Sequence, residues 1–226
     1  MIKRLLVLGA ISLSALSSFT VSAATLQLDF GVSFGDPLDP DTAAPSGPAP
    51  WLTAIFDDGG TAGSVTLTLS VAGTVGDAEV TQVYLNVDDA IGAGNLTINS
   101  AGGTGPVAGT SHQTGTDAFK ADADGWYDIL FSMPNNMDTF DGGETLIFDI
   151  TANSLVASSI NFLSTPDPVD PNGPFLGAAK FASTSGCVTG PGECSDWVGA
   201  VPVPAAVWLF GSGLLGLVGL ARRKKA

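Results

Sequence analysis

Three aspartates around one glycine are the closest thing in this chain to a metal-binding loop. Asp122, Asp124 and Asp128 flank Gly125, and the first two alternate along the chain. Calcium favours six to eight oxygen ligands, so alternate carboxylates can converge on it. The spacing departs from that of a helix–loop–helix calcium site, which needs glycine at the sixth position and glutamate at the twelfth. Two interpretations stay open, a calcium loop and a solvated hairpin turn, and no other cofactor is expected.

Catalytic groups are scarce. The single histidine, His112, lies in a run rich in glycine, threonine and serine at 102–115, and the chain has no Gly-x-Ser-x-Gly motif. A serine or cysteine hydrolase needs a base beside its nucleophile, so an isolated loop histidine does not indicate one. A glycosidase needs only two carboxylates about 5 to 10 Å apart, and pairs arise by chance among 22 acidic residues. We therefore expect no catalytic residues, and a glycoside hydrolase is the least favoured function.

Aromatic residues offer a different kind of site. Trp51, Trp126 and Tyr127 could stack on sugar rings if they shared an exposed face. Core packing is the favoured alternative, because a domain of this size needs large apolar side chains and tryptophan is usually substantially buried. Trp197 and Trp208 flank the apolar end of the chain, where we expect aromatics of a membrane interface.

The end of the chain has the features of a membrane segment. Residues 205–221 carry no charge, and these 17 residues would span about 25 Å as a helix at 1.5 Å per residue. That length suits a thin or locally compressed bilayer. By the positive-inside rule, the cations that follow hold the end of the chain in the cytoplasm and leave the upstream domain on the other side. This basic stop consists of Arg222, Arg223, Lys224 and Lys225.

A proline motif stands directly before the apolar run. Pro202 and Pro204 fix φ and lack an amide hydrogen, so we expect the motif to be extended and exposed. An extended segment is what a processing peptidase needs, although prolines are also common where a plain helix begins. The motif consists of Val201, Pro202, Val203, Pro204 and Ala205.

This order of signals resembles the sorting tail of PEP-CTERM proteins, in its Val-Pro-x-Pro-Ala variant. The resemblance is carried by residues 201–205, 208–214 and 221–224, roughly a tenth of the chain. Val203 stands where the commonest form of the motif has glutamate. The resemblance implies a substrate of exosortase, a membrane-embedded enzyme like a cysteine transpeptidase that recognises the tail. It also implies delivery to the cell surface or the exopolysaccharide matrix.

The start of the chain has the three parts of a secretory signal. Lys3 and Arg4 precede an apolar stretch at 5–16, and small residues follow at 21–24. We expect cleavage after Ala23. The sequence thus predicts a signal peptide at 1–23, an exported domain at 24–200 and a sorting tail at 201–226.

Charge is concentrated in the exported domain. All 22 acidic residues lie between Asp29 and Asp196, whereas only Lys120 and Lys180 of the eight basic residues do, which gives the domain a formal charge of −20. Nucleic-acid binding needs clustered lysine and arginine, so this class of partner is excluded. The expected partners are an exosortase-type enzyme, the membrane through the C-terminal helix, and exopolysaccharide.

The two cysteines suit an oxidising compartment. Cys187 and Cys194 enclose six residues that include a Gly-Pro-Gly turn. Export favours a local disulfide. By constraining the unfolded chain it would stabilise the fold by roughly 2 to 3 kcal/mol, and it would brace the stem beside the membrane. A metal site is a poor rival, because the single histidine is distant in sequence.

Apolar and polar residues alternate in short runs separated by Gly, Asp, Asn, Ser and Pro, which is typical of β-strands and turns. The segments 35–50 and 166–174 are expected to be surface loops. The pattern predicts an all-β fold with a single antiparallel β-sandwich of jelly-roll-like type. Strands are expected at 26–34, 52–56, 65–71, 83–87, 96–98, 126–131, 146–150, 160–163 and 178–182.

We expect a membrane-anchored precursor whose domain lies outside the cytoplasm, and then a structural or adhesive protein of the cell surface or exopolysaccharide matrix. A carbohydrate-binding module of that matrix is the alternative. Two internal blocks, 119–131 and 173–180, also resemble segments of exported PEP-CTERM domains, which brings no known activity.

Overall fold

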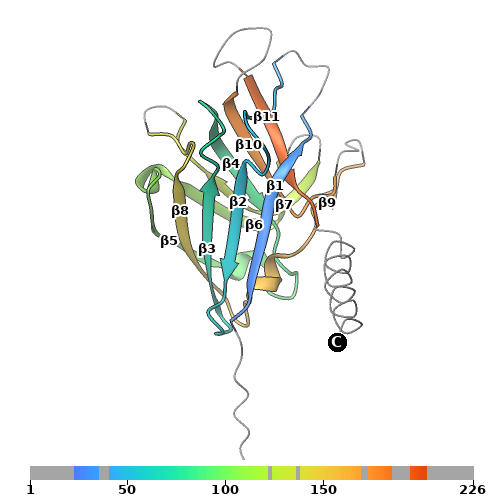
Figure 1. Ribbon diagram of the computed structural model, residues 1–226. Helices are drawn as coiled ribbons and strands as arrows, with labels where there is room; N and C mark the ends of the chain where they lie inside the picture. Colours follow the sequence, from blue (N-terminus) through green and yellow to red (C-terminus); the bar gives the residue numbers. More distant parts are fainter. Residues whose placement is uncertain are drawn as a thin grey trace, which may run out of the picture.

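The structure is a computed structural model, and it describes residues 23–35, 41–121, 124–135, 138–168, 173–184 and 194–202. In these ranges the chain is all-β, with eleven strands and three short 3-10 helices (Figure 1). The strands are β1 (Thr25–Ser33), β2 (Leu52–Asp57), β3 (Ser64–Val71), β4 (Glu79–Leu85), β5 (Thr97–Gly103), β6 (Ser111–Ala121), β7 (Gly125–Ser132), β8 (Thr145–Thr151), β9 (Thr165–Pro166), β10 (Gly177–Thr184) and β11 (Cys194–Ala200). The 3-10 helices are η1 (Ala93–Asn95), η2 (Val107–Gly109) and η3 (Ala157–Ile160).

One antiparallel sheet runs through the molecule in the order β5-β8-β3-β2-β1-β11-β10-β4-β7-β6, and β9 pairs with β7. We call β5, β8, β3, β2 and β1 the front layer, and β11, β10, β4, β7 and β6 the rear layer. The sheet folds over on itself. Strands β7 and β8 are near opposite ends of the strand order, yet the ring centroids of Phe131 in β7 and Phe148 in β8 lie 4.7 Å apart. Figure 1 shows β4, β7 and β6 behind the front layer. The fold is therefore an all-β, sandwich-like one.

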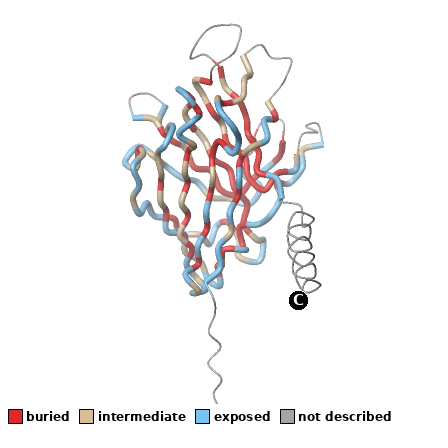
Figure 2. The backbone as a smooth tube through the Cα atoms, in the orientation of Figure 1, coloured by how far each residue is buried: buried red, intermediate tan, exposed pale blue. Residues whose placement is uncertain are grey.

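The space between the layers holds the main core. Along β3, Val65, Leu67, Leu69 and Val71 are buried and the intervening Ser and Thr residues are not. This is the period of two that a half-buried strand requires. Residues of the rear layer, such as Val83, complete the same core. Burial alternates along the front strands in Figure 2.

The rear layer buries its outward face as well. A second apolar cluster forms there, in which Phe34 stacks on Phe175 with ring centroids 4.7 Å apart. Tyr84 of β4 lies 5.5 Å from the ring of Trp197 of β11. Phe34 and Phe175 come from the segments beyond β1 and before β10, so loop residues cover the rear sheet. The cluster consists of Phe34, Tyr84, Ala121, Tyr127, Leu130, Phe175, Ala178 and Trp197.

Eight of the nine expected strands overlap observed strands, and the expected strand at 160–163 is wrong. Ile160 ends η3 and enters the core, whereas Phe162 and Leu163 point outward with 40% and 46% of their surface exposed. The sequence missed β6, β9 and β11. Because β11 is buried on both faces, it shows no alternation, and because β6 is mostly exposed and polar, its pattern is that of a loop.

The predicted membrane-directing segments fall largely outside the described residues. Only Ala23 of the expected signal peptide, and Val201 and Pro202 of the expected tail, belong to the described ranges. No helix within those ranges is both long and apolar enough to cross a membrane. The signal peptide and the C-terminal helix therefore stay predictions.

Candidate functional site

Asp124, the second aspartate of the expected metal loop, is fully buried. Its carboxylate accepts hydrogen bonds from the Tyr127 hydroxyl and, at 3.1 Å, from Ser164 Oγ. Burial first, and the charge of Asp124 second, raise the pKa of Tyr127, so the phenol stays protonated as a donor. Ser164 Oγ also accepts the Phe175 N–H at 3.2 Å. Asp124 therefore ties β7 to the segment that covers the rear layer.

Asp128, the third aspartate of the expected loop, is 5% exposed and accepts two backbone N–H groups. Val87 N donates to its Oδ2 at 3.1 Å and Asp117 N to its Oδ1 at 2.9 Å. Burial raises the pKa of Asp128, and these two hydrogen bonds oppose the rise. Asp117 has φ of 47°, a conformation in which aspartate is several-fold enriched. Asp128 thus fixes an irregular part of β6 against the end of β4.

The expectation of a solvated turn is wrong for both described aspartates, because each is buried and hydrogen-bonded to its own set of donors. Asp122 lies outside the described residues. In the ranges that the structure describes, no group of three or more His, Cys, Asp or Glu side chains is placed to hold a metal ion. The described pair therefore lends no support to the calcium loop at Asp122, Asp124 and Asp128.

The proposed sugar-stacking trio does not form one face. Trp51 is 9% exposed and donates from Nε1 to the Gly47 carbonyl at 3.2 Å, and Tyr127 is fully buried. Trp126, with 37% of its surface exposed, is the one member that a ligand could contact. Core packing, the favoured alternative, holds for Trp51 and Tyr127. The interfacial role expected for Trp197 is wrong, because it is 9% exposed in the second apolar cluster; Trp208 lies outside the described ranges.

His112 belongs to a strand and not to the expected loop. It lies on β6, exposed, with its ring centroid 6.4 Å from that of Phe131. The glycines and hydroxyl side chains of the run at 102–115 suggest a loop, but its residues 111–114 pair with β7. The ring that His112 contacts among the described residues belongs to an apolar side chain, Phe131.

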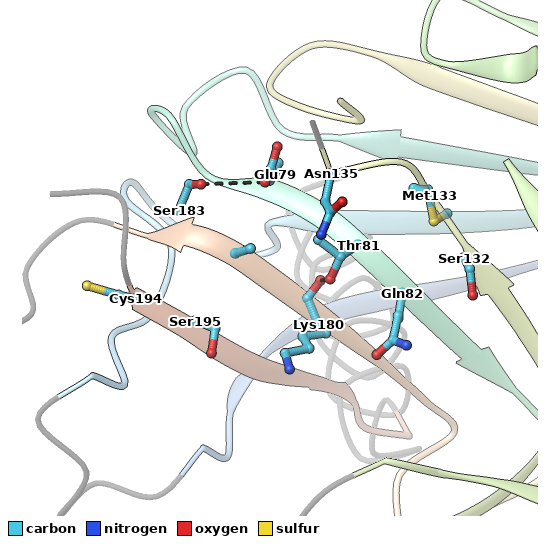
Figure 3. Close-up of a pocket in the computed structure, with 11 residues that line it drawn as sticks. Glu79, Thr81, Gln82, Ser132, Met133, Asn135, Lys180, Ser183, Cys194 and Ser195 are labelled. Atoms are coloured by element: carbon cyan, nitrogen blue, oxygen red, sulfur yellow. Dashed lines mark hydrogen bonds between the residues drawn. The ribbon is translucent and has the colours of Figure 1, made fainter. Parts of the chain in front are cut away.

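A polar groove of about 590 Å³ lies on β4, β10 and β11 of the rear layer (Figure 3). Ser183 Oγ donates to Glu79 Oε1 at 3.5 Å across it, and Lys180 Nζ lies 5.5 Å from the ring centroid of Trp197. Several hydroxyl groups line the groove, including that of Ser195, but His112 does not. The groove therefore offers hydrogen bonds and one cation without a histidine base for a nucleophile.

A smaller recess of about 160 Å³ lies where β4 ends. Asn86 is 4% exposed there, accepts the Asp128 N–H through Oδ1 at 3.1 Å, and has no hydrogen-bond partner for Nδ2 among the described residues. Sequence reasoning missed this site, because Asp117 is remote from Asp88 along the chain and nothing local links them. We call it the acidic recess, and it is lined by Asn86, Val87, Asp88, Asp89, Asp117, Asp128, Phe162, Leu163 and Thr165.

Cys194 begins β11 and is buried. It is in the disulfide form, and no free cysteine occurs in the part of the chain that is described. Its expected partner, Cys187, lies outside the described residues, so the Cys187–Cys194 pairing stays a prediction. Cys194 is part of the sheet, and its expected role in bracing a stem beside the membrane stays a prediction.

The proline motif begins where the sheet ends. Ala200 is the last residue of β11 and pairs with both Phe30 of β1 and Gly177 of β10. Val201 follows with 43% of its surface exposed, and Pro202 is exposed too. Val203, Pro204, Ala205 and the basic stop lie outside the described residues.

Comparison with known proteins adds no assignment. No family model, no curated protein and no solved structure matches this chain.

Proposed function

We propose that this chain is an exported structural or adhesive protein of the cell surface or exopolysaccharide matrix, sorted through its C-terminal tail by an exosortase-type enzyme. The proposal includes removal of residues 1–23, a jelly-roll-like arrangement of the sandwich, and a transient membrane anchor at 205–221. Support comes from the order of the tail signals, which are a proline motif, an uncharged run and four adjacent cations. It is not an enzyme in this proposal.

One structural observation carries the proposal. Ala200 is held by two neighbouring strands, and the chain becomes exposed at Val201 and Pro202, the first residues of the motif. A peptidase needs an exposed, extended substrate, and it cannot easily act on a strand that is paired on both sides. The boundary between folded domain and exposed chain therefore coincides with the boundary that the sorting motif predicts.

The surface suits a hydrated matrix. The formal charge of −20 keeps the domain soluble and repels other anionic polymers unless cations bridge them. The outward face of the front layer carries hydroxyl and carboxylate side chains, such as Thr66, which donates to Asp149 at 3.1 Å. These features favour a role among hydrated polymers over a role at an apolar protein interface.

The test is the intact mass of the protein recovered from the medium, the cell surface and the membranes of cells that carry the tail-processing enzyme. We expect the surface form to lack about the first 23 residues and the chain beyond about Val201. Replacing Pro202 and Pro204 by alanine, or the four cations at 222–225 by glutamine, should leave an unprocessed precursor in the membrane fraction. A surface form that keeps residues 202–226, delivered equally well by both variants, would refute sorting through the tail.

A further inference from the structure

The first half of β1 has a neighbouring strand on one side only. Each residue from Thr25 to Phe30 pairs with β2. On the other side β11 reaches only as far as Phe30, which pairs with Ala200. Among the described residues, no strand pairs with 25–29 on that side, so this stretch is an open edge within the sheet. An open edge presents unpaired N–H and C=O groups and can accept a further strand.

Two hydrogen bonds show which backbone groups of β1 face the open side. Ala24 O accepts an N–H from the residue after β2 at 3.2 Å, and Phe30 O accepts one from the residue before β2 at 2.9 Å. The even-numbered residues of this stretch therefore direct their backbone groups to β2. Because the direction alternates along an antiparallel strand, Thr25, Gln27 and Asp29 present theirs to the open side.

A groove of about 680 Å³ lies along this open edge. Its lining includes residues 25–29 of β1, Leu176, and the two residues that follow β11, Val201 and Pro202. The inward side chains of this part of β1 are Leu28, which is buried in the main core, and Leu26, which packs against that core. The groove thus combines unpaired backbone groups with an apolar lining.

The chain that leaves β11 is in phase with the open edge. Ala200 O accepts the Leu176 N–H at 2.8 Å, so the backbone groups of Ala200 point towards β10. Those of the next residue in a continued strand would point towards β1. Continued from the pair Phe30↔Ala200, the register places every second residue of 201–205 opposite a position of β1 whose backbone groups are open.

The two prolines of the motif fall where such a strand accepts them. Every position of Val-Pro-Val-Pro-Ala that would face β1 has an N–H, and the two that would face away are Pro202 and Pro204, which have none. Proline is confined to edge strands, where its nitrogen faces solvent and blocks further pairing. In this register the proline rings lie opposite Leu28 and Leu26, on the apolar side of the groove. A shift by one residue would turn both prolines towards β1 and remove their ladder hydrogen bonds.

We propose that the proline motif, residues 201–205, adds to the open half of β1 as a short edge strand and fills this groove. Strand addition gains affinity from main-chain hydrogen bonds, and the motif follows β11 directly, which makes the contact intramolecular. The exposure of Val201, 43% of its surface, describes the state with the groove open. The consequence for processing rests on the proposed function: a motif paired with β1 is withheld from the peptidase until the strand is released.

The test is amide hydrogen exchange, resolved by residue with NMR, on the full-length chain purified in detergent. We expect the N–H groups of Gln27 and Asp29 to exchange at least about tenfold more slowly in the unchanged chain than in Val203→Pro. This substitution removes the N–H that would face Gln27 and puts a proline ring against β1. Leu28, whose N–H is directed to β2, is the internal reference and should exchange equally in both.

Val203→Ala is the matched control, because it shortens the same side chain but keeps the N–H, so it should retain the slow exchange. Pro204→Ala should retain it too, since the N–H that it adds faces away from β1. The proposal is overturned if Gln27 and Asp29 exchange as fast as exposed amides in the unchanged chain, or if Val203→Pro leaves their exchange slow. Slow exchange that survives Val203→Pro and strengthens with protein concentration would assign the edge to a second copy instead.

This test is independent of the sorting test. Hydrogen exchange is measured on purified protein without the sorting enzyme, whereas sorting is judged by mass in cells. Fast exchange with normal processing would overturn the strand addition alone, and slow exchange with no processing would overturn the sorting proposal alone.

Discussion

The front layer of the sandwich buries one face of its strands, whereas the central strands of the rear layer are buried on both. Along β3, residues alternate between buried and partly exposed, but in β11 six of seven residues are buried. The difference arises from Phe34 and Phe175, which cover the rear sheet from outside. Two halves of one sheet thus meet different environments because of residues that do not belong to its strands.

The sharpest way to probe what both layers share is to remove a side chain between them. Phe131 is fully buried on β7 and lies against Phe148 of β8. We expect Phe131→Ala to lower the free energy of unfolding by about 3 to 5 kcal/mol, because it loses apolar burial and leaves a cavity where the layers meet. Urea unfolding measures the change. A loss below about 1 kcal/mol would mean that the layers do not depend on one another.

The two outward faces can be compared directly. Tyr84 of β4 is 4% exposed within the second apolar cluster, and Thr68 of β3 is an outward residue of the front layer. We expect Tyr84→Ala to lower the free energy of unfolding by about 3 kcal/mol and Thr68→Ala to change it by less than about 0.5 kcal/mol. Equal losses in urea unfolding would contradict the conclusion that the outward face is buried in the rear layer and not in the front layer.

The cover of the rear layer depends on a buried carboxylate. Asp124→Ala would leave the Tyr127 and Ser164 hydroxyls without this acceptor, so we expect a loss of about 2 kcal/mol in the free energy of unfolding. Tyr127→Phe removes one donor and should cost about 1 kcal/mol, because Ser164 still bonds the carboxylate. Thermal unfolding of both variants shows which of them loses more stability. A more stable Asp124→Ala variant would show that this polar network does not hold the cover.

The two layers should also differ in how pH changes their contribution to stability. We expect these changes to be smaller than those of the substitutions above. Burial raises the pKa of Asp196 on β11 above its ordinary 3.8, so the folded state holds this proton more tightly. Stability from this group falls as pH rises from about 3.8 through the raised pKa, and it stays lower above that. Asp196→Asn should remove this decline in urea unfolding followed from acidic to neutral pH. An unchanged profile would contradict a buried charge at this position.

Asp58, which follows β2 in the front layer, has a pKa shifted in the opposite direction to that of Asp196. The backbone N–H groups of Ala24 and Gly60, above all, lower its pKa below the ordinary 3.8. Its contribution is present above about pH 3.8 and is lost as pH falls through the lowered pKa. Asp58→Asn should therefore make stability less sensitive to acid, which unfolding at acidic pH measures. A steeper acid loss in the variant would be the contrary result.

The sequence predicted the front layer better than the rear one for a physical reason. Half-buried strands such as β3 alternate in polarity, and this alternation is visible without a structure. Strand β11 is buried on both faces because distant loop residues cover it, which no local pattern reveals. The same limit applies to the candidate sites. For Asp124, the local pattern allowed a calcium loop or a solvated turn, whereas its observed environment comes partly from Ser164, far along the chain.

Strand β11 also has a mechanical consequence. It lies inside the sheet, between β1 and β10, and the chain leaves it at Ala200. A pull on the chain beyond Ala200 would act along the strand axis and load the pairs with β10, from Gly177↔Ala200 to Thr184↔Cys194, together in shear. An edge strand peeled from one end would release its pairs one at a time. The rate of unfolding governs resistance to such a pull, and that rate depends on breaking these pairs together.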